Sequence, residues 1–230
     1  MSRALHSFPT LFCAEACDPH ELRELRQLGT SVVFPSGKTI FSEDERADSV
    51  FGLSDGVARL YKTLADGRRQ VVAFPLPGDF LGMPFADRHR FSADAVGETA
   101  LYRFLRSELM HFVQSSPNIM RRLMEFAAHE LDMAQHQLML LGNGSAEEKV
   151  ATFLVNWRDR LAHLTNVLQP VPLPMRRQDI ADFLGLQLET ISRTLAKLEQ
   201  KNVIRLTPKG VLLNGLDHMS LATGRTAAEV

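Results

Sequence analysis

The sequence predicts an α+β fold: first a small antiparallel barrel or sandwich, then a long helix, and last a helix-turn-helix followed by a hairpin. Three observations lead to this prediction. Short β-rich runs alternate with turn residues between Thr30 and Phe104. An apolar repeat of period 3.5 follows Ser116. Two short apolar-periodic segments then flank Gly185. The 230 residues suffice for a sizeable core and for two domains.

The composition is that of a soluble globular protein, with 45% hydrophobic and 23% charged residues. The formal net charge of −1 predicts no partner, but residues 173–210 hold seven Lys or Arg against four Asp or Glu, a weak basic footprint. No run of about 18 apolar residues occurs, so no membrane span is expected. His6, Ser7 and Pro9 interrupt the apolar start, so we interpret residues 1–19 as a cytoplasmic tail rather than a signal peptide.

The β-rich part comprises the runs "TSVVF", "KTIF", "SVFGL", "VARLYKT", "RQVVAF" and "TALYRF". Gly, Pro or Asp separates them at short intervals, which is typical of antiparallel strands in a barrel or sandwich. Asp66-Gly67 in "LADGRRQVVAF" predicts a hairpin turn.

Ser116-Pro117 suits the start of a helix, and Gly142-Asn143-Gly144 suits its end. Apolar or small residues within it recur at alternating spacings of three and four, which predicts a narrow dimer seam: Met124, Ala127, Leu131, Ala134, Leu138 and Leu141. The alternative is an amphipathic helix packed on its own barrel. Ser145 can cap a further helix, with Glu147 and Glu148 in its first turn, and the proline-containing stretch "NVLQPVPLPM" then forms an extended connector.

The stretch from Arg177 to Lys201 predicts two helices joined by a "GLQ" turn, which is the helix-turn-helix layout. Inward positions at Ile191, Leu195 and Leu198 leave Glu189, Ser192 and Arg193 on the exposed arc. In this layout the start of the second helix meets base edges in the major groove of DNA. The chemistry is suitable, because Arg can bond guanine, Glu can accept from cytosine, and Ser can serve either role or touch a thymine methyl. The alternative is an ordinary surface helix with a Glu189–Arg193 ion pair.

Further side chains suit phosphates rather than bases, namely Arg177, Thr190, Lys197, Lys201 and Lys209. Lys209 lies in "VIRLTPKGVLLNG", which predicts two short strands around Pro208-Lys209-Gly210. Such a hairpin is either a DNA-contacting wing or a plain solvent-exposed hairpin.

On these motifs the chain resembles the CRP/FNR family of bacterial transcription regulators over nearly its whole length. "PGDFLG" at 77–82 and "RQDIADFLGLQLETISRTLAKLE" at 177–199 carry the resemblance. It implies a cyclic-nucleotide-binding-like β-roll over 20–115, a dimerisation helix over 116–143 and a winged helix-turn-helix over 144–230. It also implies RNA polymerase as a partner.

The segment "ETISR", Glu189 to Arg193, is similar to the recognition helix of the FNR and FixK branch. There the matching Glu, Ser and Arg read TTGA(T/C), which implies an inverted repeat of the type TTGAT-N4-ATCAA. Two positions depart from other members. Gln187 stands where Ser or Thr commonly caps the recognition helix, and Gln is a poorer cap, by about 1 kcal/mol. Leu188 stands where the CRP branch carries an Arg that reads guanine, which favours an FNR-like half-site.

The residues by which known members sense signals are missing from this chain. Met83 and Phe91-Ser92 replace the Glu and the Arg-Ser pair of cAMP-binding members, so a buried cyclic phosphate would lack its charge partner. Pro84 replaces the haem-ligating His of CO sensors, and His89 in "ADRHR" is expected to be a solvated residue rather than a ligand. A [4Fe–4S] cluster normally needs four thiolates, and the chain has only Cys13 and Cys17.

These absences resemble the FixK subgroup, whose members are typically active without a small ligand, so we expect neither cAMP nor a [4Fe–4S] cluster as cofactor. Two alternatives stay open. Cys13 and Cys17 are either a redox or metal-binding pair or two ordinary thiols. An apolar ligand or haem could also lie in the roll, which offers Phe51, Phe74, Phe80, Phe85 and Phe104, although most of these are expected in the core.

The sequence thus predicts a homodimeric, cytoplasmic, DNA-binding transcription regulator and not an enzyme, since nothing arranges a nucleophile with a base. By resemblance, its targets concern low-oxygen, nitrogen-oxide or nitrogen-fixation metabolism. The competing class is a ligand-binding module whose C-terminal part contacts another protein.

Overall fold

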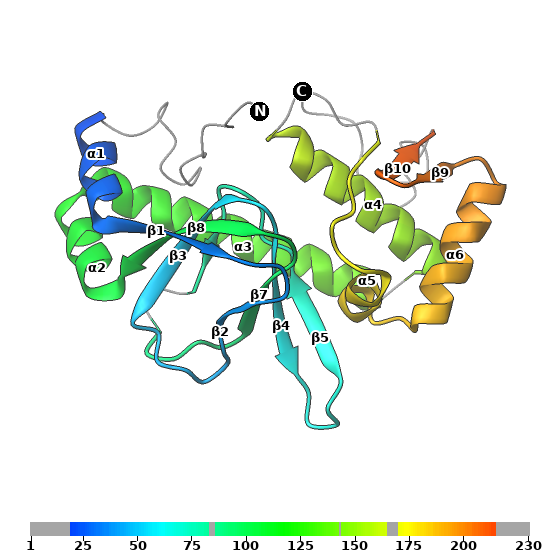
Figure 1. Cartoon of the computed structure of the whole chain (residues 1–230), viewed down its shortest axis with the longest axis horizontal. Helices are drawn as coiled ribbons and strands as arrows, with labels where there is room; N and C mark the ends of the chain where they lie inside the picture. Colours follow the sequence, from blue (N-terminus) through cyan, green and yellow to red (C-terminus); the bar gives the residue numbers. More distant parts are fainter. Residues whose placement is uncertain (1–18, 83–85, 143, 165–169, 215–230) are drawn as a thin grey trace. The chain divides into compact units, whose positions relative to one another are not determined.

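The structure is a computed structural model that describes residues 19–82, 86–142, 144–164 and 170–214 (Figure 1). Cys13, Cys17, Met83, Pro84 and the C-terminal stretch 220–230 lie outside these residues. The chain divides into two compact units, Met1–Ala134 and Gln135–Val230.

Unit 1 consists of a β-roll with helices at its two ends. Its elements are α1 (Pro19–Leu28), β1 (Gly29–Phe34), β2 (Thr39–Phe41), β3 (Ser49–Asp55), β4 (Ala58–Thr63), β5 (Arg69–Ala73), β6 (Phe80–Leu81), β7 (Ser92–Ala95), β8 (Thr99–Leu105), α2 (Arg106–Ser115) and the start of α3 (Pro117–Gly142). The strands form two four-stranded sheets of order β1-β8-β3-β6 and β2-β7-β4-β5, and the pairs within them are antiparallel. The predicted antiparallel β domain is confirmed.

The two sheets enclose an apolar core that includes Phe41, Phe51, Leu53, Leu81 and Leu101. A second cluster packs the helices onto the first sheet and contains Leu25 of α1, Val50, Phe104 and Leu109 and Phe112 of α2. Among the phenylalanines proposed for a ligand pocket, Phe51, Phe74 and Phe104 are buried. Phe80 is partly buried against the second cluster, and Phe85 lies outside the described residues.

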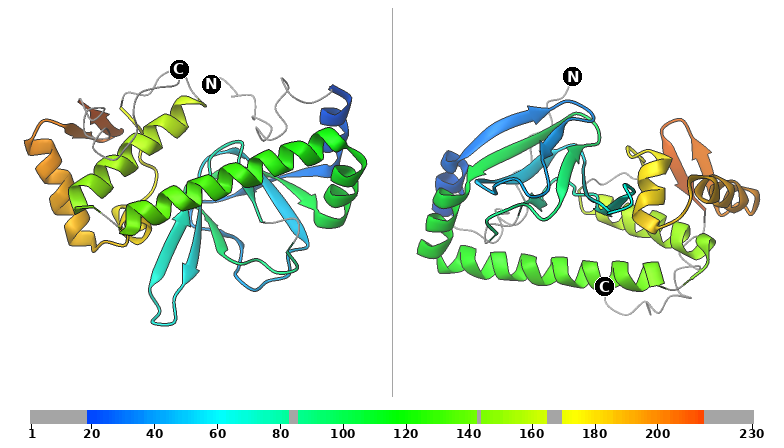
Figure 2. Two further views of the ribbon diagram at one scale, coloured as in Figure 1. Left: turned by 180° about the vertical axis from the view of Figure 1, so that it is seen from behind. Right: turned by 90° about the horizontal axis from the view of Figure 1, so that it is seen from below.

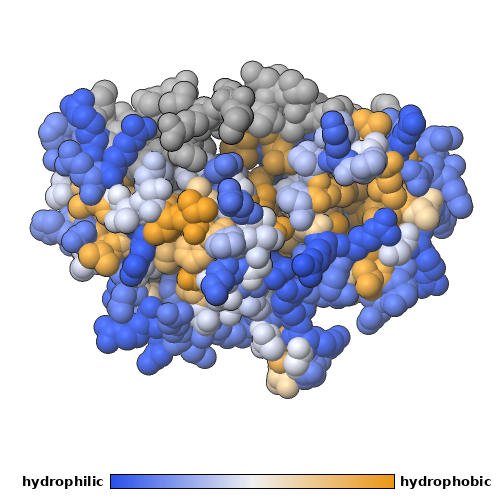
Figure 3. Space-filling view, in the orientation of Figure 1, coloured by the Kyte–Doolittle hydropathy of each residue, from blue (hydrophilic) through white to orange (hydrophobic). Residues whose placement is uncertain are grey.

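The six runs that the sequence marks as strands correspond to β1 to β5 and β8. The β4–β5 hairpin turns at Gly67, whose φ is +81°; it points downward in Figure 1, and its tip projects at the bottom of Figure 3. The sequence did not reveal β6 and β7. The first has two residues, and the second, "SADA", has no β-branched or aromatic side chain to mark it.

The third helix, α3, begins at Pro117, ends at Gly142 and is continuous in both views of Figure 2. In its first part Met120 and Leu123 pack against the cluster of α1 and α2, and Phe126 meets Phe80 edge to face at 6.2 Å. This face of α3 is therefore attached to the roll by apolar contacts.

Unit 2 contains the remaining part of α3 and then α4 (Ala146–Ala162), α5 (Arg177–Leu184), α6 (Leu188–Gln200), β9 (Ile204–Thr207) and β10 (Gly210–Leu213). Ser145 caps α4 through a capping box with Glu148, as its position at the start of the predicted helix suggests. Gly185 ends α5 in the left-handed conformation with φ of 64°. At Gly210 a Cβ atom would lie 2.0 Å from the carbonyl oxygen of Val171, so only glycine fits where this connector residue pairs with β10.

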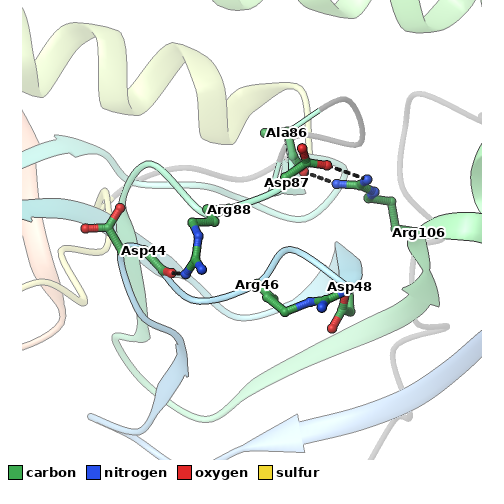
Figure 4. Close-up of polar contacts among 7 residues, drawn as sticks. All are labelled: Asp44, Arg46, Asp48, Ala86, Asp87, Arg88 and Arg106. Atoms are coloured by element: carbon green, nitrogen blue, oxygen red, sulfur yellow. Dashed lines mark hydrogen bonds and ion pairs between the residues drawn. The ribbon is translucent and has the colours of Figure 1, made fainter.

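Two loops of unit 1, residues 42–48 and 86–91, are bound to each other (Figure 4). The amide of Asp44 donates to the carbonyl oxygen of His89 at 2.8 Å. The guanidinium of Arg88 donates to the carbonyl oxygen of Asp44 at 2.5 Å. Arg106, the first residue of α2, fastens the second loop from outside, because its guanidinium donates to the carboxylate of Asp87 at 2.8 Å. These contacts hold the backbone of His89 in place on one side of the roll.

The His89 side chain is buried, with 6% of the residue exposed, so the expectation of a solvated side chain is wrong. Its imidazole stacks on Phe41 with ring centroids 3.8 Å apart and planes inclined by 15°. The charged neighbours in "ADRHR" suggested exposure to solvent. Asp87, Arg88 and Arg90 are exposed, whereas the imidazole between them lies against Phe41. Within the described part of the chain, no group of three His, Cys, Asp or Glu side chains is placed to hold a metal ion.

Burial lowers the pKa of His89 from its ordinary value of 6.5, and the carboxylates of Glu45 and Asp48 oppose this only in part. Well above pH 6.5 the imidazole is neutral in both the folded and the unfolded chain. As the pH falls below 6.5, the unfolded chain binds a proton that the folded chain excludes, so the free energy of unfolding decreases until the folded pKa is reached.

We therefore expect His89→Phe to flatten the decrease in the free energy of unfolding between pH 7.5 and 5.5. One proton limits the difference in slope to about 1.4 kcal/mol per pH unit. Urea unfolding of both proteins at several pH values measures it. Equal slopes for the wild type and the variant would contradict the assignment of this titration to His89.

Candidate nucleic-acid interface

Three buried apolar side chains orient α6, the second helix of the helix-turn-helix. Ile191, Leu195 and Leu198 are between 0% and 3% exposed, as their spacing predicts. They pack in the interior of unit 2, whose buried side chains include Leu154, Trp157, Ile180, Leu184, Ile204 and Val211. With one side of the helix fixed in this way, the rotation of α6 about its axis is determined.

The opposite side of α6 presents the three residues predicted to read bases. Glu189 and Arg193 are exposed and Ser192 is half-buried. In the described part of the chain no ion pair connects Glu189 with Arg193. The interpretation of α6 as a surface helix stabilised by that pair therefore finds no support, and both charged groups are available to another molecule.

The amino-terminal end of α6 is open to solvent. Gln187 is the N-cap residue, and its side chain makes no capping hydrogen bond, which agrees with its expected weakness as a cap. The first N–H groups of a helix carry the positive end of its dipole and suit an anion such as a phosphate. Leu188, the first residue of the helix, is 37% exposed.

In the sequence, Leu188 was considered only as a replacement for Arg, and its own capacity for apolar contact was missed. Leu188 lies beside Glu189 and presents exposed methyl groups at the amino-terminal end of α6. Contact with the C5-methyl of thymine is the chemistry that such a group supplies. Its position directly before Glu189, at the start of the helix, is the sequence signal that could have indicated this contact.

The residues predicted to contact phosphates differ in their surroundings. Arg177 begins α5 and is exposed, and Thr190 in the first turn of α6 is half-buried. Lys209 is exposed at the two-residue turn between β9 and β10, whose register pairs Thr207 with Gly210. The structure thus places the predicted hairpin directly after the second helix, with Lys209 at its tip.

Lys197 and Lys201 have a partner that the sequence did not predict. The Nζ atom of Lys201 lies 2.5 Å from Oε2 of Glu147, and Lys197 contacts the other oxygen of the same carboxylate. Hydrogen bonds from Lys197 and Lys201 hold the pKa of Glu147 below its usual range. Glu147 was expected only to complement the dipole of α4, but it joins α4 to α6.

The predicted dimer seam is largely exposed along α3. Met124, Leu131 and Leu138 are 66%, 60% and 68% exposed, and Ala127 and Ala134 are exposed as well. The side chain of Leu141 lies outside the described residues. Since the part of α3 that packs on the roll uses Met120, Leu123 and Phe126, these seam residues are not the face that the roll covers.

Comparison with known proteins agrees with this architecture. The family model described as a cyclic nucleotide-binding domain matches residues 31–116, and the model described as a Crp-like helix-turn-helix domain matches residues 148–220. The chain belongs to the CRP/FNR family. It is a DNA-binding transcription regulator of the FNR/FixK-like branch.

Relatives in this family are similar over most of their length. The transcriptional activatory protein AadR of Rhodopseudomonas palustris is 52% identical over 193 residues, 84% of this chain and 81% of that protein. The nitrogen fixation regulation protein FixK of Bradyrhizobium diazoefficiens is 50% identical over 196 residues, 85% of this chain and 83% of that protein. The solved structure of FixK2 from Bradyrhizobium japonicum superposes with a TM-score of 0.78 at 36% identity, covering 87% of this chain and 99% of that one.

None of the helices in the described part of the chain combines the length and the apolar character required to span a bilayer.

Proposed function

We propose that the protein is a homodimeric transcription activator that reads an inverted repeat of the type TTGAT-N4-ATCAA. The observation that carries this proposal is the outward arc of α6, where Glu189, Ser192 and Arg193 stand opposite three buried apolar residues. The names of its relatives, a transcriptional activatory protein and nitrogen fixation regulation proteins, support activation of genes for nitrogen fixation or low-oxygen metabolism. RNA polymerase is the partner that an activator requires.

Each reading residue has a chemical role in this proposal. Arg193 donates two hydrogen bonds to O6 and N7 of the guanine in TTGAT. Glu189 accepts from the N4 amino group of the cytosine paired with that guanine, and Ser192 and Leu188 meet thymine methyls or neighbouring edges. A carboxylate near DNA is repelled by phosphates unless a base donates to it, so Glu189 serves sequence reading rather than affinity.

The exposed seam supports the homodimer. Leucine and methionine side chains that remain more than half exposed along one line of a helix gain about 1.5–3 kcal/mol each when they are buried. A second copy of α3 supplies a matching line, and small Ala127 and Ala134 let the two backbones approach. The two recognition helices of such a dimer meet major-groove faces about one turn of DNA, roughly 34 Å, apart.

For the input signal we propose that the protein is active without cAMP and without a [4Fe–4S] cluster, because the residues that bind them in other members are absent from the sequence. The other candidate inputs remain a redox or metal-binding step at Cys13 and Cys17, and a haem or apolar ligand in the roll. None of the described contacts favours a protein partner for the C-terminal unit in place of DNA.

Arg193→Ala should remove the preference for the guanine of TTGAT over other bases, with a loss of about 1–3 kcal/mol in binding to the intact repeat. Lys209→Ala should weaken binding to all sequences alike and reduce the slope of log affinity against log salt by about 0.9 for each phosphate that is no longer neutralised. Gel shifts with intact and guanine-substituted duplexes at several salt concentrations measure both effects. An Arg193→Ala protein that retains full preference for guanine would show that its role is wrongly assigned.

Leu131→Glu combined with Leu138→Glu should convert the dimer to monomers, because four carboxylates would meet in the seam. Affinity for the full inverted repeat should fall by about 100-fold or more, since each apolar side chain removed from the seam weakens the dimer by about 1.5–3 kcal/mol. Val33→Glu is a matched control, because Val33 on β1 is 60% exposed, like Leu131. Sedimentation equilibrium measures the oligomeric state. A double variant that remains a dimer would show that Leu131 and Leu138 do not form the dimer interface.

A further inference from the structure

The contact between α4 and α6 places an anion at two lysines that are predicted to contact DNA phosphates. Lys197 and Lys201 are one helical turn apart on α6, so one carboxylate can contact both ammonium groups. Glu147 does so with its two oxygens, at 2.5 Å to Lys201 and in direct contact with Lys197. Its side chain is 22% exposed, whereas those of the two lysines are 56% and 49% exposed.

This carboxylate belongs to the DNA-facing surface and not to a remote part of unit 2. A shallow recess of about 280 Å³ lies between the start of α4 and the first turns of α6, and Glu147, Thr190, Arg193 and Lys197 are among the residues that line it. Arg193 is a base-reading residue and Thr190 a predicted phosphate contact. A DNA strand that approaches Arg193 therefore passes next to Glu147.

The charges in this cluster oppose backbone binding. Two ammonium groups would present two positive charges to the DNA, and Glu147 reduces the sum to one. A carboxylate and a phosphodiester are both oxygen anions that accept hydrogen bonds from the same ammonium donors. When a phosphate approaches, the ion pairs between Glu147 and the lysines either break or persist. Breaking them costs their interaction energy, and keeping them leaves a carboxylate that repels the phosphate, so both outcomes weaken binding.

We propose that Glu147 competes with the DNA backbone for Lys197 and Lys201, and so lowers the affinity of the protein for duplex DNA of any sequence. The inference rests on the proposed function only for the orientation of α6 toward DNA. Because phosphate contacts carry no sequence information, Glu147 changes affinity and salt dependence while leaving the preference among sequences unchanged.

The opposite role, in which Glu147 holds the lysines ready for phosphates, is disfavoured by their exposure. Lysine side chains about half exposed at the end of a flexible stem are weakly held by a surface ion pair. A carboxylate that improved binding would have to orient the ammonium groups toward DNA, but it draws both toward α4. The strongest electrostatic effect of its removal is the gain of one positive charge in each subunit.

Glu147→Gln tests the proposal because it removes the charge and keeps a side chain of the same shape between the helices. We expect the variant to bind both the TTGAT repeat and a scrambled duplex about five-fold tighter per half-site at low salt, the effect of one unit charge at close range in a solvent-exposed site. The slope of log affinity against log salt should steepen by about 0.9 for each additional phosphate neutralised. Fluorescence anisotropy with labelled duplexes at several salt concentrations measures both.

Glu148→Gln is the matched control. It removes a charge from the same turn, but Glu148 accepts from the amide of Ser145 at 2.6 Å and does not touch α6 in the described contacts; glutamine can also serve in a capping box. We expect less than a two-fold change in DNA affinity. An equal gain in both variants would show that general charge, not the contact with the two lysines, controls binding.

Thermal unfolding of each variant verifies that it folds, and Lys201→Gln provides an independent measurement. In the wild-type background Lys201→Gln should weaken DNA binding several-fold, because the cluster falls from one net positive charge to none. When both Lys197 and Lys201 are replaced by Gln, Glu147→Gln should lose most of its gain in affinity, because the carboxylate then has no lysine to withhold from phosphates. A folded Glu147→Gln protein with unchanged or weaker affinity would overturn the competition. Wild-type protein that binds the repeat no better than the scrambled duplex would instead contradict the proposed function and leave the comparison of variants on non-specific DNA valid.

Discussion

The burial of Ile191, Leu195 and Leu198 in unit 2 is the constraint on which the functional surface depends. These three side chains are nearly inaccessible to solvent, and rotating α6 to hide Glu189 or Arg193 would expose them. Exposing three such residues costs about 1.5–3 kcal/mol each. The helix therefore has one stable rotation, and in that rotation its polar arc points away from the domain. The exposure of the three proposed base-reading residues thus follows from apolar packing on the other side of the same helix.

The proposed dimer depends on a similar division of one helix between two surfaces. Along α3, Met120, Leu123 and Phe126 attach to the roll, while Leu131 and Leu138 remain exposed. The contacts with the roll lie in the first part of α3, and the exposed leucines follow them along the helix, so one helix can hold its own roll and still present an apolar line to a second copy. Since DNA sites read by paired helices need a fixed separation, a rigid α-helix suits the connection better than a flexible linker.

Much of this arrangement could be predicted from the sequence because it rests on local rules. The periods of two and 3.5 residues located most strands and α3, and Gly185 located the turn before α6. What could not be predicted depends on contacts between distant residues. Nothing in "ADRHR" indicates that His89 stacks on Phe41, and nothing near Glu147 indicates that Lys197 and Lys201 lie within reach about 50 residues later. Strand β7 was missed because its small side chains are selected by the space between sheets rather than by β propensity.

Methylation interference on the inverted repeat tests most directly whether Arg193 of each subunit bonds the guanine of one half-site. Dimethyl sulfate adds a methyl group to guanine N7 in the major groove, where it removes the acceptor that a guanidinium needs. Methylation of the single guanine in either TTGAT half-site should prevent binding, whereas methylation of guanines in flanking DNA should be tolerated. Binding that persists when both half-site guanines are methylated would contradict this contact.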